Sequence, residues 1–183
     1  PVDVTGMARW SQECSSADRD ESEVMGMGFG EMQRIDASSV VDAPIEQVWA
    51  RVTAPEGINA ELGPFVKMTI PRTFRERTVA DVTPGVPIGR SWMLLFGVLP
   101  FDASNMMIAE LDEGRRFREE STMVSMRSWA HERTLTAHGE RTEVVDAVTF
   151  VPRAPLGWIP GWGALLRTVL GALFRHRHRR LRA

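Results

Sequence analysis

One long amphipathic segment, residues 161–182, constrains what this chain can fold into more than any other feature. Basic residues fill its last turns, where positive charge suits the carbonyl end of a helix. We therefore expect a long C-terminal helix whose apolar face the rest of the chain must cover. The apolar side chains recur every three or four residues and so share one helical face: Trp162, Leu165, Leu166, Val169, Leu170, Leu173 and Phe174.

A membrane anchor is the alternative interpretation of the same region. Residues 154–174 carry a single charge, at Arg167, and a basic tail follows them, as in a tail anchor. Arg167 lies near the centre of that stretch, where insertion would cost about 2.5–3.5 kcal/mol, and Pro155 and Pro160 interrupt it. Because the apolar residues also keep to one face, we favour a helix packed against protein.

The chain before this helix predicts one strand, two short helices and then a series of strands. This order indicates an α+β fold, in which a curved antiparallel sheet must bury one face and only the last helix is long enough to cover it. Residues 71–87 are expected to be mostly loop, with room for one strand over 75–82. The expected elements are a strand at 35–41, a helix from Pro44 that breaks at Pro55, a helix at 56–62 and strands at 65–70, 88–99, 101–111, 116–125, 127–137 and 142–151, with turns at Pro100, 112–114 and 138–141.

Length and composition bound the domain organisation. The 183 residues, 43% hydrophobic and 25% charged, are typical of one globular domain. We expect residues 1–33 to be an acidic, mobile extension and residues 34–183 to form the domain.

The composition also excludes several kinds of site. Cys14 is the only cysteine, which excludes an internal disulfide and a cysteine-based zinc cluster. The net charge of −2 argues against a generally basic nucleic-acid binder, and the lack of a signal-peptide-like run predicts a cytoplasmic location.

Four stretches carry a family resemblance: residues 42–49 (DAPIEQVW), Trp129-x-His131, residues 142–150 with Thr, Val, Asp, Val and Phe at alternate positions, and residues 174–181. In this order they resemble the START and polyketide cyclase/dehydratase (SRPBCC) superfamily. The resemblance implies a helix-grip fold, in which a curved antiparallel sheet of six to seven strands wraps around the C-terminal helix. It also implies a cavity for a hydrophobic or amphipathic molecule that is lipid, polyketide or quinone-like. A fold that hosts so many functions does not choose among them.

The last hairpin holds the most informative polar residues. A turn centred on residues 139–140 pairs Arg133 with Asp146 and His131 with Val148 across two antiparallel strands. These residues share one face of the hairpin, which is expected to point inward because its other members are apolar: Trp129, Leu135, Val144 and Phe150.

Burial of these polar groups requires partners. We expect an Arg133–Asp146 ion pair that leaves one ring nitrogen of His131 open, and Glu119 on the preceding strand is a candidate to join them. Three interpretations stay open: a polar anchor that orients a ligand, an acid–base catalyst in which Asp146 poises His131, and a structural ion pair beside a core histidine.

Binding of a hydrophobic small molecule is the leading function that we predict. The runner-up is a cyclase or dehydratase that uses His131 with Arg133 and Asp146, and the third is an adaptor that meets a lipid surface through the basic tail. The residues expected to contact a ligand are Trp129, His131, Arg133, Asp146, Val148, Glu119, Leu166, Val169, Leu170 and Leu173.

We expect no metal, no cofactor and no nucleic acid as partner. His176 and His178 lie two residues apart on a helix and cannot face one ion together. Residues 175–182 are interpreted as a solvated helix end. The alternatives are contact with the acidic extension or a partner subunit, and binding to anionic lipid or nucleic acid. Strand 88–99 is apolar on both faces. The N-terminal segment or a homodimer partner would cover the outer one.

Overall fold

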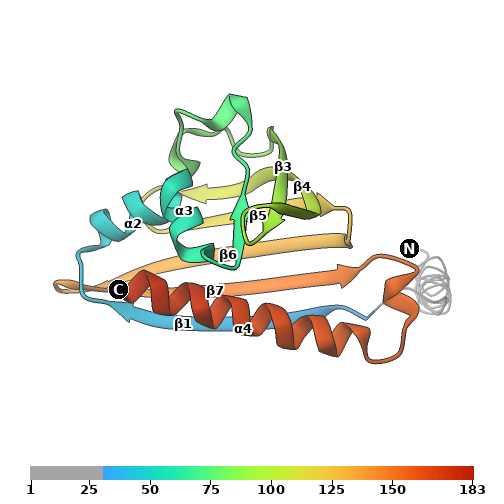
Figure 1. Cartoon of the computed structure of the whole chain (residues 1–183). Helices are drawn as coiled ribbons and strands as arrows, with labels where there is room; N and C mark the ends of the chain where they lie inside the picture. Colours follow the sequence, from blue (N-terminus) through green and yellow to red (C-terminus); the bar gives the residue numbers. More distant parts are fainter. Residues whose placement is uncertain (1–30) are drawn as a thin grey trace, which may run out of the picture.

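Figure 1 shows the computed structural model of the chain, which describes residues 31–183. Most of the predicted mobile extension, with Cys14, lies outside the described residues. The first elements are β1 (Gln33–Val41) and the helices α2 (Ile45–Thr53) and α3 (Pro55–Leu62). The others are, in chain order, β2 (Val66–Met68), the 3-10 helices η4 (Arg72–Phe74) and η5 (Val79–Asp81), β3 (Pro87–Leu95), β4 (Leu99–Asp112), β5 (Arg116–Met123), β6 (Met126–His138), β7 (Arg141–Pro152), the 3-10 helix η6 (Leu156–Trp158) and α4 (Trp162–Arg182).

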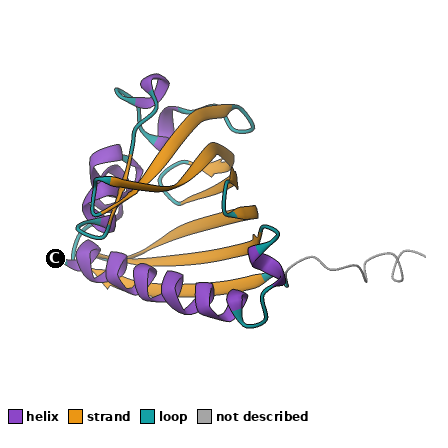
Figure 2. Cartoon of the chain, turned by 45° about the vertical axis from the view of Figure 1, so that its right-hand side comes forward, coloured by secondary structure: helices purple, strands orange, loops and turns teal. Residues whose placement is uncertain are grey.

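The strands form one antiparallel sheet of seven strands in the order β1-β7-β6-β5-β4-β3-β2. The sheet curls, and α4 runs along β1, with α2 and α3 near the C-terminal end of α4 (Figures 1 and 2). The predicted α+β helix-grip fold, with its two short helices after the first strand, is confirmed.

The register of the last hairpin is also as predicted. Arg133 pairs with Asp146, His131 with Val148 and Trp129 with Phe150. Along β7 every second residue is buried, because successive side chains of a strand point to opposite faces and only one face of this strand meets the core. Arg133 and Asp146, both on the buried face of the hairpin, therefore point into the domain.

Two expected strands are wrong in detail. Strand 88–99 ends at Leu95, because the turn lies at residues 96–98, and Pro100 falls inside β4 opposite Leu94. Phe96 and Gly97 have φ angles of 51° and 76°, the left-handed conformation that closes a tight hairpin. Residues 75–82 form no strand, since Thr78 and Asp81 make a reciprocal cap on the 3-10 helix η5.

The C-terminal helix turns a different stripe toward the sheet than expected. Val169, predicted to contact a ligand, is 55% exposed, and Leu165 is 51% exposed. Gly171 faces Ile35 of β1 instead, with space for a Cβ 4.0 Å from the isoleucine side chain. The stripe that faces the sheet is therefore rotated toward Gly171, Arg177 and His178, away from Leu165 and Val169. The covered stripe is Leu166, Leu170, Leu173, Phe174, Arg177, His178 and Leu181.

This rotation makes a testable distinction between two apolar positions on α4. Phe174→Ala should lower the free energy of unfolding by about 3–5 kcal/mol, because Phe174 is 2% exposed and its truncation leaves a cavity. Val169→Ala, five residues earlier on the solvent face, should change it by less than about 0.5 kcal/mol. Urea denaturation of the two variants measures the difference, and equal losses would contradict the assignment of faces.

Candidate functional site

A cavity of about 130 Å³ lies between the inner face of the sheet and α4. Its wall is largely apolar and contains several methionines. The methionine side chain is unbranched and polarisable, so it adapts easily to the shape of a neighbouring group. The wall can therefore change shape around an occupant. Five methionines belong to it: Met68, Met93, Met106, Met123 and Met126.

Four polar side chains interrupt this apolar wall: Ser104, Glu119, His131 and Arg177. Ser104, on β4, is 2% exposed. Within residues 31–183 its Oγ is the one buried side-chain nitrogen or oxygen without a hydrogen-bond partner. A buried hydroxyl without a partner costs free energy, so this position favours a molecule that brings a partner.

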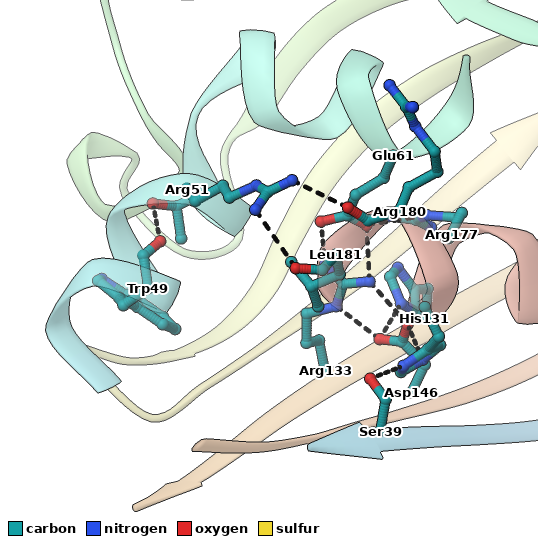
Figure 3. A network of polar contacts seen from close by, with 12 residues as sticks. Ser39, Trp49, Arg51, Glu61, His131, Arg133, Asp146, Arg177, Arg180 and Leu181 are labelled. Carbon is teal, nitrogen blue, oxygen red and sulfur yellow. Dashed lines mark hydrogen bonds and ion pairs between the residues drawn. The ribbon is translucent and has the colours of Figure 1, made fainter. Parts of the chain in front are cut away.

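Arg133, fully buried on β6, sits between two carboxylates beside the cavity (Figure 3). Its Nε and one Nη each donate to Asp146 at 2.7 Å. Its two Nη atoms donate to Glu61 of α3 at 2.9 and 3.0 Å. Arg177 of α4 also pairs with Glu61, at 3.0 Å. Two arginines and two carboxylates thus form a charge-balanced cluster that joins α3, the sheet and α4.

Asp146 also accepts hydrogen bonds from two histidines. His131 Nε2 lies 2.9 Å from Oδ1, and His178 Nε2 lies 3.0 Å from Oδ2. With the two bonds from Arg133, each carboxylate oxygen accepts two, which fills the capacity of the ionised group. Because an ionised carboxylate only accepts, each neutral imidazole carries its proton on Nε2 and keeps Nδ1 as an acceptor. At His178 that acceptor receives the hydroxyl of Ser39, 2.7 Å away.

The charges of the cluster are fixed by their mutual contacts. Burial alone would raise the pKa of Asp146, but the charge and hydrogen bonds of Arg133, together with His131, hold that pKa well below its ordinary value. Burial likewise opposes ionisation of Glu61, and Arg133 and Arg177 nevertheless lower the pKa of Glu61. Neither carboxyl group is therefore suited to exchange a proton near neutral pH, and both serve as permanent anions.

His131 belongs both to this cluster and to the cavity wall. Its ring lies between Phe117 and Phe174, with centroids 6.0 and 5.3 Å away, both edge to face. Its Nδ1 is 4.0 Å from Glu119 Oε2, which is too far for a hydrogen bond. The other oxygen of Glu119 accepts the hydroxyl of Ser121 at 2.7 Å. In the neutral ring Nδ1 and this Oε2 are both acceptors, and no hydrogen bond within residues 31–183 joins them.

The predicted ligand contacts divide into two groups of five. Those that line the cavity are Glu119, Trp129, His131, Leu170 and Leu173. The others lie elsewhere. Arg133 and Asp146 are fully buried in the ion cluster, Val148 is fully buried in the core, and Leu166 packs against that core. Val169 points to solvent.

The interpretation of residues 175–182 as a solvated helix end is wrong for Arg177 and His178, which are 7% and 4% exposed. Both continue the face of Phe174 by three and four residues, and Leu181 follows, so the helical period was the signal that could have found them. The end of α4 is also held, because Arg51 of α2 donates to the carbonyl oxygens of Arg180 and Leu181 at 3.0 and 3.3 Å.

Glu61 and Ser104 were missed as well. Nothing in the local sequence around either residue indicates its role, because the partners of Glu61 lie far along the chain and Ser104 is defined by having none among the described residues.

Two further findings concern the described residues 31–183. No group of three or more His, Cys, Asp or Glu side chains there is arranged to hold a metal ion. None of the helices in this part of the chain has the length and apolar character needed to cross a bilayer.

Removal of Asp146 tests the ion cluster. Asp146→Ala should lower the free energy of unfolding by about 3–5 kcal/mol, because it unbalances a buried charge and leaves the donors of Arg133, His131 and His178 without their acceptor. The double variant Arg133→Met/Asp146→Leu removes both charges and should cost far less. Urea denaturation at neutral pH compares them, with Glu143→Ala on the same strand, 42% exposed, as the control. A double variant as unstable as the single one would contradict the explanation.

Ser104 offers a second test. Ser104→Ala should leave the free energy of unfolding of the ligand-free protein unchanged or raise it, because the hydroxyl has no hydrogen bond to lose. Ser121→Ala, on the neighbouring strand, is the matched control and should cost about 1 kcal/mol, since its hydroxyl donates to Glu119. A clear loss of stability in Ser104→Ala would show that this hydroxyl is already satisfied.

Solved structures share this fold at low sequence identity. Protein CV1439 from Chromobacterium violaceum is 17% identical, with a TM-score of 0.62 over 81% of this chain and 94% of that one. The Zhui aromatase/cyclase from Streptomyces sp. R1128 is 16% identical, with a TM-score of 0.62 over 82% and 92%. A START superfamily protein from Mycobacterium smegmatis is 12% identical, with a TM-score of 0.58 over 81% and 94%.

At these identities the likeness establishes the fold, which is that of START and polyketide cyclase-like proteins. No curated protein sequence matches the chain significantly. The model of a family described as Domain of unknown function (DUF8410) matches residues 39–183, a range that holds the whole ion cluster and the cavity wall. The chain therefore belongs to the DUF8410 family.

Proposed function

We propose that the protein binds an apolar or amphipathic small molecule in the cavity between the sheet and α4. The observation that carries this proposal is the wall itself, an apolar lining around about 130 Å³ of empty space, with the unpartnered hydroxyl of Ser104 in it. Empty apolar space and an unsatisfied buried hydroxyl both cost stability. A bound molecule with an apolar body and a polar group would relieve both costs.

The size of the cavity limits what can enter without rearrangement. An apolar cavity of about 150 Å³ holds a benzene ring, whereas pockets for larger ligands usually reach about 300–1,000 Å³. The space present here is thus sufficient for one ring, and a larger ligand requires the methionines to move. Lipid, polyketide and quinone-like molecules all suit such a wall, and two relatives of the same fold are named a START superfamily protein and an aromatase/cyclase.

Catalysis is a second candidate function, and the contact between His131 and Asp146 is the observation that favours it. A carboxylate holds one ring nitrogen of a histidine that lines the cavity, which is the arrangement of a general base. A cyclase or dehydratase of this kind would use His131 directly, whereas Arg133 would act only through Asp146.

The variant His131→Ala separates binding from catalysis. In an enzyme it abolishes turnover and largely keeps binding, and in a carrier it changes ligand affinity alone.

A cytoplasmic location and a homodimer remain predictions. The surface that supports a homodimer surrounds the β3–β4 turn, where apolar side chains between 45% and 79% exposed gather: Trp92, Phe96, Val98, Leu99 and Phe101. Such exposure suits a contact with another molecule.

Blocking the cavity tests the proposed binding function. Native mass spectrometry of protein purified from its own host under mild conditions should show a retained small molecule. Leu170→Trp fills the cavity from α4 and should abolish the retained mass. Val169→Trp, the adjacent residue on the exposed side of the helix, should leave it unchanged. If both variants retained the same molecule, it would be bound elsewhere.

A further inference from the structure

The two histidines on Asp146 are held in the same way but differ at the opposite ring nitrogen. Each presents Nε2 to one carboxylate oxygen, at 2.9 Å for His131 and 3.0 Å for His178. At His178, Nδ1 receives the hydroxyl of Ser39 at 2.7 Å. His131 lines the cavity, and its Nδ1 lies 4.0 Å from Oε2 of Glu119, which lines the cavity as well.

We infer that a ligand hydroxyl takes, at His131, the place that Ser39 takes at His178. The ligand is then an uncharged alcohol or phenol on an apolar frame, and its O–H donates to His131 Nδ1 or to Glu119 Oε2. This inference rests on the proposed binding function and specifies the chemical class of the ligand.

The chemistry of the two facing atoms selects a donor. His131 Nδ1 is an acceptor in the neutral ring, and a carboxylate oxygen of Glu119 accepts only. An ether oxygen, a ketone or a carboxylate would add a third acceptor between them and leave all three without a proton. A hydroxyl supplies the missing proton and makes one short bond of the kind seen at His178.

The charges near the cavity also favour an uncharged ligand. Arg133 and Arg177 are matched by Glu61 and Asp146, so the cluster holds no unpaired arginine charge that would attract an anion. Arg177, the one arginine in the wall, already pairs with Glu61 and lies over the ring of Phe174, 4.9 Å from its centroid. An anionic ligand would compete with Glu61 for that charge and would also meet the carboxylate of Glu119.

Ser104 supplies a second polar point in the same wall. On β4 it lies four residues from Ile108, which pairs with Glu119. At about 3.3 Å per residue, the two polar points are roughly 13 Å apart along the strand. Because a serine hydroxyl both donates and accepts, this point suits a second oxygen of either kind. The wall therefore favours a molecule with a hydroxyl at one end and another oxygen toward the opposite end.

Three probes that share one apolar body test the selection of a donor. Isothermal titration calorimetry at neutral pH compares 4-propylphenol, its methyl ether and 4-propylbenzoate. The phenol should bind the wild-type protein at least about ten-fold more tightly than either of the others, because only the phenol donates without bringing charge. Equal affinity of all three would overturn the inference and leave the proposed binding function standing. Absence of binding by every probe would count against both.

Glu119→Gln tests the site itself. Its amide oxygen can still accept from Ser121, while its NH₂ group places a donor where Glu119 Oε2 placed an acceptor, still about 4 Å from His131 Nδ1. The roughly ten-fold preference for 4-propylphenol over its methyl ether should shrink toward parity, because the ether oxygen now has a donor in the amide, with no decrease in melting temperature. Glu120→Gln, the next residue on the same strand with a side chain 43% exposed, is the matched control and should change neither affinity.

An unchanged preference for the phenol in Glu119→Gln would overturn the assignment of the hydroxyl to this pair of acceptors.

Ser104→Ala tests the second polar point. It should lower the affinity for a probe with a second oxygen on the propyl chain, 3-(4-hydroxyphenyl)propan-1-ol, and leave the affinity for 4-propylphenol unchanged. Equal effects on both probes would show that Ser104 does not contact the second oxygen.

Discussion

The fully hydrogen-bonded carboxylate of Asp146 is the interaction on which the arrangement of the other elements depends. It joins β6 to β7 through Arg133 and reaches α4 through His178, while Arg133 continues to Glu61 of α3. Burying ions costs more than their attraction returns unless every remaining donor and acceptor is satisfied. Because those groups come from four separate elements, the cluster ties the positions of α3, β6, β7 and α4 to one another.

The same cluster explains why the cavity combines a rigid point with an adaptable wall. His131 is held by Asp146 on one side and lies between the rings of Phe117 and Phe174, so the direction of its Nδ1 is set before any ligand arrives. Orientation that is already fixed does not have to be paid for on binding. The methionines around it have no such constraint. Such a site fixes the position of one polar group of the ligand but accepts different shapes for the apolar part of the ligand.

The sequence predicted what depends on short-range periodicity, and it failed where distant elements meet. The pairing of Arg133 with Asp146 followed from the position of one turn and the two-residue period of the strands. The place of Glu61 depended on how α3 docks on the sheet, which no local pattern encodes. Val169 was placed inward because the apolar face of α4 was taken as a whole, whereas the helix turns Gly171 toward β1 and Val169 toward solvent. Arg177 and His178 were assigned to a basic tail although they share the helical face of Phe174.

The order of elements along the chain has a consequence for folding during synthesis. All seven strands precede α4, and the hairpin that carries Arg133 and Asp146 leaves the ribosome before residues 162–182 do. Until α4 emerges, the concave face of the sheet and its charged groups lack the cover and the partners that His178 and Arg177 supply. Native packing of this domain is therefore completed only after α4 is free, and the uncovered sheet is the species in which a chaperone would find exposed apolar surface.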